Sequence, residues 1–293
     1  MSVTEEGTVY GRPEFQNIDV SAQMRDGHVD VRDGDDVIVG LVAARAASLG
    51  RNLDIIDVGT GSGFLCDLLA DRLPHSRIVA NEIEPVMVEQ ARGRLKDRPN
   101  VEIFDKPFSE WSDAVDVIIS WGTHHHMPHS YLEQSGALLR EGGVLILGDE
   151  FAPEYCDERD AARIAAAPVV ELRDGYVLTS AEDIAAHERS GALPEWSLAL
   201  EDRRRRALWH WYKFVIDCAI KGSYWTIALA EMQIAMDDIT TSFEEEHKIS
   251  PLIVERELQL NGFTTLSKNV VGQRDASLQS FFVYEFAPAA RQS

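Results

Sequence analysis

Three consecutive histidines in the middle of the chain, His124, His125 and His126, are the residues best suited to catalysis. Imidazole titrates near neutral pH, so each of them is a candidate general base that could take a proton from a hydroxyl or an amine. The alternative is a structural role, in which the histidines bind backbone groups where a loop enters a helix. Both interpretations are open at this point.

A metal site is a further interpretation of this loop, since neutral imidazole is a common ligand of zinc and iron. Adjacent histidines converge on one metal only with help from elsewhere, and the residues that could provide it are Asp149, Glu150 and His210. No complete ligand set is evident, and we expect no metal. Glu150 is also a candidate catalytic residue, because a carboxylate beyond a strand can act as a base. Its structural alternative is to cap the following segment.

A glycine-rich turn lies further upstream. The apolar stretch 53–58 predicts a strand, and Gly59, Gly61 and Gly63 follow it before a predicted helix. Such a turn brings backbone N–H groups close to a ligand, and a Cβ would block the approach. A dinucleotide-binding turn would have its third glycine where Phe64 stands, so the spacing here is G-x-G-x-G instead.

Further strands are predicted over residues 77–81, 101–104, 115–120 and 143–148. In an open α/β sheet, ligands bind beyond the carboxyl ends of the strands. Glu82, Asp105 and the histidine loop follow three of these ends. An acid such as Glu82 can accept hydrogen bonds from both hydroxyls of a ribose. The alternatives are an ordinary surface acid for Glu82 and a turn-forming residue for Asp105.

The G-x-G-x-G turn behind Asp57, with Glu82 after the next strand, resembles motif I of the class I S-adenosylmethionine-dependent methyltransferases. His125, His126 and Met127 resemble the small-molecule branch of that family, and the Asn/Asp-Pro-Pro-aromatic motif of its DNA and protein amide methylators is absent here.

The resemblance implies S-adenosylmethionine as cofactor, with Asp105 meeting the adenine amino group. The implied cofactor contacts are Asp57, Gly59, Thr60, Gly61, Gly63, Glu82, Ile83, Asp105, Lys106 and Ser120.

The fold class implied is α/β, with a Rossmann-like, mostly parallel seven-stranded sheet, an antiparallel terminal strand and a helical cap insertion. We expect an N-terminal arm or lid over residues 1–34 and the cofactor-binding core over residues 35–150. The cap or dimerisation insertion would occupy residues 151–249. Residues 250–293 would return to the core with its last helix and terminal strand hairpin.

The expected cap has two apolar helical stripes. The first is Leu208, Trp211, Tyr212, Val215, Cys218 and Ala219. The second is Leu229, Met232, Met236, Ile239 and Phe243, a coiled-coil-like seam that would join two copies in a homodimer or fold over the core. Aromatic residues of the cap could line an apolar substrate pocket, or belong to the core or a dimer face.

Charge and cysteine content limit the partners and the compartment that we expect. The chain has 293 residues and a formal charge of −21, with a pI near 4.7, so we expect no nucleic acid partner. The basic run 203–206 is expected to be a solvated helix face. Three unevenly spaced cysteines favour a reducing compartment, and neither a signal peptide nor a membrane-spanning run is evident. We therefore expect a cytoplasmic protein without a membrane partner.

The function expected from the sequence is methyl transfer from S-adenosylmethionine to O, N or C of a small-molecule acceptor, in specialised metabolism. Two alternatives remain: an NAD-linked oxidoreductase on a similar fold, and a non-catalytic cofactor-binding or scaffold protein.

Overall fold

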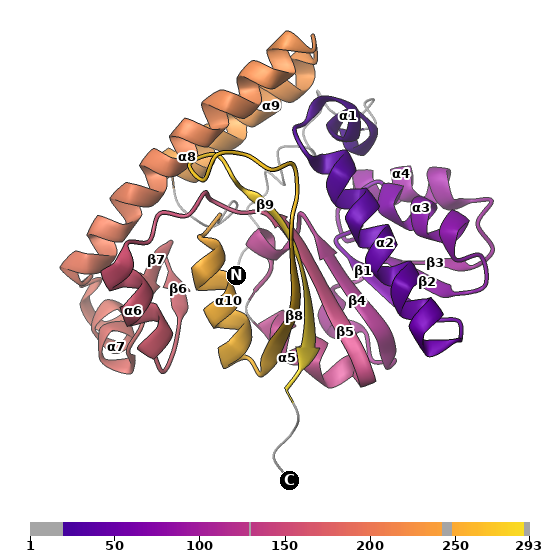
Figure 1. The fold of residues 1–293 in the computed structure, drawn as a ribbon, viewed down its shortest axis with the longest axis horizontal. Helices are drawn as coiled ribbons and strands as arrows, with labels where there is room; N and C mark the ends of the chain where they lie inside the picture. Colours follow the sequence, from indigo (N-terminus) through magenta and orange to yellow (C-terminus); the bar gives the residue numbers. More distant parts are fainter. Residues whose placement is uncertain (1–19, 129, 242–247, 290–293) are drawn as a thin grey trace.

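The computed structural model describes residues 20–128, 130–241 and 248–289. Its centre is a seven-stranded sheet in the order β3-β2-β1-β4-β5-β9-β8. Neighbouring strands from β3 to β5 are parallel, whereas β9 is antiparallel to both β5 and β8 (Figure 1). The predicted mixed sheet with an antiparallel last strand is confirmed.

The strands of this sheet are β1 (Asp54–Val58), β2 (Arg77–Asn81), β3 (Val101–Phe104), β4 (Val115–Trp121), β5 (Leu139–Glu150), β8 (Phe263–Val270) and β9 (Phe281–Pro288). The helices that pack near it are α1 (Val20–Gly27), α2 (Val31–Leu49), α3 (Phe64–Arg72), α4 (Pro85–Leu95), α5 (Ser130–Leu138) and α10 (Pro251–Leu260), with short 3-10 turns η2 (Phe108–Glu110) and η3 (His124–His126).

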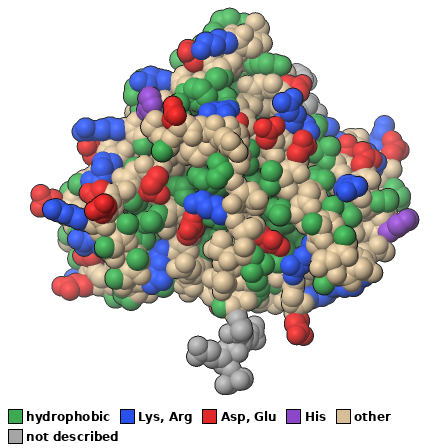
Figure 2. Space-filling model, viewed as in Figure 1, with side chains coloured by type: hydrophobic (Ala, Val, Ile, Leu, Met, Phe, Trp, Pro, Cys, Tyr) green, Lys and Arg blue, Asp and Glu red, His purple; other side chains and the backbone are tan. Residues whose placement is uncertain are grey.

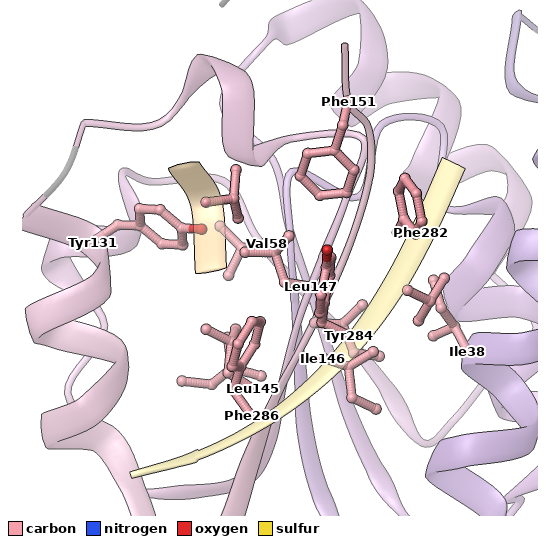
Figure 3. Close-up of a cluster of buried hydrophobic side chains, with 14 of the residues drawn as sticks. Ile38, Val58, Tyr131, Leu145, Ile146, Leu147, Phe151, Phe282, Tyr284 and Phe286 are labelled. Carbon is pink, nitrogen blue, oxygen red and sulfur yellow. The ribbon is translucent and has the colours of Figure 1, made fainter. Parts of the chain in front are cut away.

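The core lies on both faces of the sheet. Strands β4 and β5 are buried along most of their length because helices cover them on both sides. In Figure 3, Ile146 of β5 lies on the side of Ile38 from α2, and Tyr131 of α5 points in from the other side. All three residues are buried. The register pairs Val58 of β1 with Ser120 of β4, so the carboxyl ends of these strands meet at one edge.

The chain between β5 and α10 contains helices α6 (Glu158–Ala166), α7 (Ala181–Ser190), α8 (Glu195–Lys221) and α9 (Trp225–Met236), followed by a π-helical turn η4 (Asp237–Thr241). It also contains a hairpin of β6 (Glu171–Arg173) and β7 (Tyr176–Leu178), which the helical prediction missed. Asp174 and Gly175 form its turn with positive φ angles of 47° and 81°. Asp-Gly is a strong hairpin signal, so the sequence did carry the information.

The apolar stripe of α8 is buried except for Cys218, which is half-buried. Of the predicted seam, Ile239 is partly buried against the core, whereas its three residues on α9 are exposed. Leu229, Met232 and Met236 are 62%, 54% and 49% exposed. Instead, the opposite face of α9, with Ile227 and Ile234, packs inward. The seam residue Phe243 lies outside the described residues. The helical spacing of the apolar residues was predicted correctly, but a second apolar stripe two positions away forms the face that packs.

The expectation of a solvated basic face over residues 203–206 is wrong for Arg204. This guanidinium is 1% exposed and donates to Glu201 and to Asp238, at 2.8 and 2.7 Å. Two carboxylates compensate the cost of burying its charge. Arg206, by contrast, is exposed and pairs with Asp202, as expected for a solvated face.

The N-terminal arm is more regular than its sequence indicated. Residues 20–27 form α1, and α2 starts at Val31, within the expected arm of residues 1–34. Asp30 precedes α2 with a positive φ of 71°, which makes the bend between the two helices. Helix α1 contacts α2 and α9, so it bridges the core and the α8–α9 hairpin. Residues 1–19 of the arm lie outside the described residues.

On the face shown in Figure 2, acidic and basic side chains are interspersed with apolar ones. None of the helices described is both long and apolar enough to cross a membrane.

Candidate functional site

The glycine turn after β1 forms a close-approach cradle. Gly59 and Gly63 have φ angles of 70° and 77°, which favour glycine. A Cβ at Gly59 would come within 2.4 Å of the Thr123 side chain, and one at Gly63 within 2.7 Å of Leu95. The N–H groups of Gly59 and Thr60 both donate to the carbonyl of Asn81, at 2.9 Å. The turn is therefore held between β2 and the loop after β4.

Asp57, near the end of β1, stabilises this turn through its side chain. Its carboxylate is buried and accepts from the hydroxyl of Thr60 at 2.7 Å, with the thiol of Cys66 at 3.4 Å. Burial raises the pKa of Asp57 to about 7, although both hydrogen bonds favour the charged form. Asp57 and Thr60 thus hold the shape of the turn.

Glu82 lies against the same turn, at the end of β2. One carboxylate oxygen accepts from the N–H of Gly61 at 2.8 Å, and the other accepts from Ile83 and Glu84 at 2.8 and 2.9 Å. Burial raises the pKa of Glu82 above its ordinary value, against the effect of these N–H donors. The neighbouring Ile83 side chain is 60% exposed, which leaves an apolar surface beside the carboxylate.

The predicted adenine contacts lie further out. Asp105 is exposed and pairs with Arg92 of α4 at 2.6 Å, and Lys106 is exposed with Glu110 at 3.8 Å. The carbonyl of Lys106 nevertheless accepts from the Asn81 amide at 2.8 Å, which ties this loop to the end of β2. The described contacts bring Gly61 and Glu82 together but leave the Asp105 side chain on the surface.

His125 and Asp149 form a dyad beyond β4 and at the end of β5. The ring Nδ1 of His125 lies 2.8 Å from Asp149 Oδ1, and the His125 N–H donates to Oδ2 at 3.2 Å. Burial opposes ionisation of Asp149, but the charge and hydrogen bond of His125 outweigh it and lower the pKa of Asp149. An ionised carboxylate on Nδ1–H leaves Nε2 of His125 as the proton acceptor.

The other two histidines have different environments. His124 is buried, with Nδ1 2.5 Å from the Tyr131 hydroxyl and Nε2 3.5 Å from Glu257. His126 is exposed, and its ring centroid lies 4.0 Å from that of His125. Only His125 therefore combines an oriented ring with partial exposure.

Thr123 joins the dyad loop to the glycine turn. Its hydroxyl donates to the carbonyl of Gly59 at 3.3 Å, and it precedes the dyad histidine by two residues. Ser120 is buried in β4 beside Val58, directly behind this junction. Thr123 was not among the predicted site residues. Its position directly before the histidine run was the available signal.

Glu150 points into a different cluster. Its carboxylate lies 3.1 Å from Lys248 Nζ and 3.5 Å from His28 Nε2, and His28 Nε2 is 3.4 Å from Glu231. His28, Glu231 and Lys248 come from the α1–α2 bend, α9 and the segment before α10, so no local pattern linked them. The proposed extra metal ligand His210 is exposed on α8. Within the described residues, His124, His125 and His126 belong to no group of three convergent metal-ligand atoms.

Comparison with known proteins agrees with this geometry. Residues 55–143, from β1 to β5, match the model of a family described as a methyltransferase domain. This chain carries the methyltransferase domain of the class I S-adenosylmethionine-dependent superfamily. S-adenosylmethionine is the cofactor of that superfamily. Glycines without room for a Cβ, and a carboxylate beside an exposed apolar side chain, fit such a ligand in this methyltransferase domain.

Two relatives share part of the methyltransferase domain. A malonyl-[acyl-carrier protein] O-methyltransferase of Acetivibrio thermocellus is 45% identical over 73 residues, which are 24% of this chain and 25% of the relative. A tRNA1(Val) (adenine(37)-N6)-methyltransferase of Bacteroides thetaiotaomicron is 37% identical over 87 residues, or 28% and 37% of the two chains. The chain thus spans between a quarter and just over a third of these relatives.

Among solved structures, the CurJ carbon methyltransferase has a TM-score of 0.55 at 14% identity, over 97% of this chain and 62% of that one. At this identity, the likeness is one of fold alone.

Proposed function

We propose that this protein transfers the methyl group of S-adenosylmethionine to a small-molecule acceptor, with His125 as general base. The proposal rests on the closeness of the His125–Asp149 pair to the glycine turn. The Thr123–Gly59 contact holds the His125–Asp149 pair beside the glycine turn, at the ends of β1, β4 and β5.

When bound, S-adenosylmethionine supplies an electrophilic methyl carbon whose S–C bond breaks, leaving the electron pair on sulfur. This chain holds the cofactor through Gly59, Gly61 and Glu82 and presents His125 to the acceptor. A nucleophilic oxygen, nitrogen or carbon of the acceptor forms the new bond, and its proton passes to His125 Nε2. Asp149 keeps Nδ1 protonated and stabilises the charged ring. Holding acceptor and methyl in line would provide much of the rate.

The acceptor site would lie between the strand ends and the α8–α9 hairpin. Phe281 of β9 is surrounded there by aromatic rings, with the His28, Trp121 and Trp211 centroids at 5.4, 6.0 and 6.3 Å. Such a lining suits an aromatic or otherwise apolar acceptor. Entry would need a separation of α1 and the hairpin from the core.

The substrate names of the relatives do not decide the acceptor, because one names an acyl-carrier protein and the other a tRNA. The matches span only 24% and 28% of this chain. A net charge of −21 disfavours RNA. The preference for a small molecule therefore rests on the aromatic residues around Phe281.

The direct test is calorimetry with S-adenosylmethionine and with NAD, followed by a screen of small metabolites for release of S-adenosylhomocysteine. We expect binding of S-adenosylmethionine alone and acceptor-dependent release. Binding of the cofactor without transfer to any acceptor class would favour the scaffold alternative. Preferential binding of NAD would overturn the proposal.

A homodimer remains a prediction for the exposed row of Leu229, Met232 and Met236 on α9. These side chains follow one another at helical spacing and include no charge, so a second copy of the same row could cover them.

A further inference from the structure

A buried His–Glu–Glu cluster lies beneath the α8–α9 hairpin, and its histidine ring also borders Phe281 of the proposed acceptor site. Its members are His28 from the α1–α2 bend, Glu150 from the end of β5 and Glu231 from the inner face of α9. His28 is 5% exposed and Glu231 is 1% exposed. One ligand atom of each residue lies within 4.8 Å of the others, so three distant segments converge on one point.

The tautomer of His28 directs a lone pair toward the two carboxylates. Nδ1 lies 2.7 Å from the carbonyl oxygen of Val29, and a carbonyl can only accept, so Nδ1 carries the proton. In the neutral ring, Nε2 then has a free lone pair. This atom is buried and makes no hydrogen bond within the described structure. An imidazole whose other nitrogen donates to a backbone carbonyl is the usual arrangement of a metal-binding histidine.

The distances favour an ion over a direct hydrogen bond. His28 Nε2 is 3.5 Å from Glu150 Oε2 and 3.4 Å from Glu231 Oε1. A charge-assisted N–H···O bond measures about 2.7–2.9 Å. Ligands of a tetrahedral zinc ion, with bonds of about 2.0–2.1 Å, lie roughly 3.3–3.4 Å apart. The two separations from His28 Nε2 are thus close to the edges of such a coordination shell, and the two carboxylate oxygens lie within 4.8 Å of one another.

We propose that His28, Glu150 and Glu231 bind one divalent first-row transition-metal ion, for which zinc is the probe. One imidazole nitrogen and two carboxylates suit zinc, whereas magnesium prefers oxygen ligands alone. Three protein ligands leave a coordination position for water or for an oxygen atom of a small molecule. The site does not depend on methyl transfer.

Lys248 sets the orientation of Glu150 in this site. Its Nζ lies 3.1 Å from Glu150 Oε1, which leaves Oε2 facing His28. The same ammonium group donates to the Tyr212 hydroxyl at 2.8 Å. The hydrogen bond from Lys248 to Tyr212 would hold this ammonium group in place, as outer-shell hydrogen bonds commonly do around metal ligands.

A surface cavity of about 320 Å³ lies at the α1–α2 bend, and His28 lines it together with Arg25, Asp30 and Arg274. Asp30 is paired with Arg274 at 2.6 Å. The side chain of His28 is itself fully buried, and neither Glu150 nor Glu231 lines this cavity. An ion would therefore reach the cluster through a local opening of the bend or of the hairpin.

The test uses the full chain without a polyhistidine tag, stripped of metal with a chelator and dialysed. We expect calorimetric titration with zinc to show one tight site, elemental analysis to show about one zinc per chain, and zinc to raise the melting temperature. His28→Gln and Glu231→Gln should each weaken this site at least tenfold. Because both substitutions keep the size of the side chain, circular dichroism and binding of S-adenosylhomocysteine can establish that the variants are folded.

Two matched controls separate this site from other histidines. His187 pairs with Asp174 at 2.8 Å in the insertion, and His187→Gln should leave zinc binding unchanged. His126→Ala tests the histidine loop, and it should also leave the tight site unchanged. Equal zinc binding by folded wild-type and His28→Gln proteins would overturn the proposal, as would loss of the tight site in His126→Ala alone. Absence of a tight zinc site in the wild type would overturn the proposal as well.

Discussion

The Nδ1 atom of His125 lies 2.8 Å from Oδ1 of Asp149. The backbone N–H of His125 donates to the other carboxylate oxygen, Oδ2. The pair joins the loop after β4 to the end of β5 and fixes the imidazole orientation. A second imidazole–carboxylate contact, between His187 and Asp174, also measures 2.8 Å and lies at the surface of the insertion. The chain thus contains its own control for a histidine–aspartate contact.

His125→Gln should lower turnover by about two to four powers of ten and leave the affinity for S-adenosylmethionine nearly unchanged. The pKa of Asp149 is lowered, so its carboxylate stays charged across the neutral range. A limb of the pH–rate profile near neutrality should therefore belong to the imidazole and disappear in the variant. His187→Gln should keep wild-type turnover. Equal turnover of wild type and His125→Gln would exclude the general base.

His124→Leu should lower stability rather than catalysis. The substitution removes the partner that the Tyr131 hydroxyl and Glu257 have at this ring, which should cost about 1–3 kcal/mol. Activity per folded molecule should stay close to that of wild type. Urea unfolding and turnover, measured on the same samples, check this. A stable variant with no activity would restore a chemical role for His124.

Glu82→Ala should weaken binding of S-adenosylmethionine by about 1–3 kcal/mol, because charge-assisted hydrogen bonds to the ribose would be lost. Calorimetry measures this. Glu89→Ala, an exposed acid on the adjacent helix α4, is the control and should bind as wild type does. If a folded Glu82→Ala protein binds with unchanged affinity, Glu82 lies outside the cofactor site.

Asp57→Asn should alter how stability depends on pH. Burial raises the pKa of Asp57 to about 7, whereas the unfolded value is about 3.9, so the wild-type fold loses stability as pH rises between these values. Asparagine is neutral throughout. The variant should therefore gain about 2–3 kcal/mol relative to wild type between pH 5 and pH 7. Denaturant unfolding at several pH values measures this.

The exposed Asp113→Asn is the control for Asp57→Asn, and its difference from wild type should stay nearly flat over the same range. A flat difference for Asp57→Asn as well would show that the buried carboxyl has an ordinary pKa.

The double substitution Met232→Glu and Met236→Glu should reduce the molecular mass in light scattering from dimer to monomer. Both side chains are about half exposed in the single chain, so the stability of the monomer should barely change. Lys213→Glu, at an exposed position of α8, adds a charge elsewhere and should leave the mass unchanged. A wild-type protein that is already monomeric would exclude the dimer.

The sequence by itself determined the parts of this protein that depend on local pattern. The strand predicted over residues 77–81 agrees with β2 to the residue, because strand patterns act within a few positions. The cofactor class was implied by the resemblance of the G-x-G-x-G turn and Glu82 to the class I methyltransferases. Their closeness in space was predictable because consecutive strands of a parallel sheet end at one edge.

Only the tertiary structure decided which environment each of several similar residues has. His124, His125 and His126 are identical in type, yet one packs against Tyr131, one pairs with Asp149 and one is exposed. On α9, packing chose the face of Ile234 over the seam of Met232. His28, Glu150 and Glu231 are separated by more than eighty positions at each step, so no spacing could reveal their contact. Such groupings arise from the way helices close over a sheet, a long-range property that periodicity does not encode.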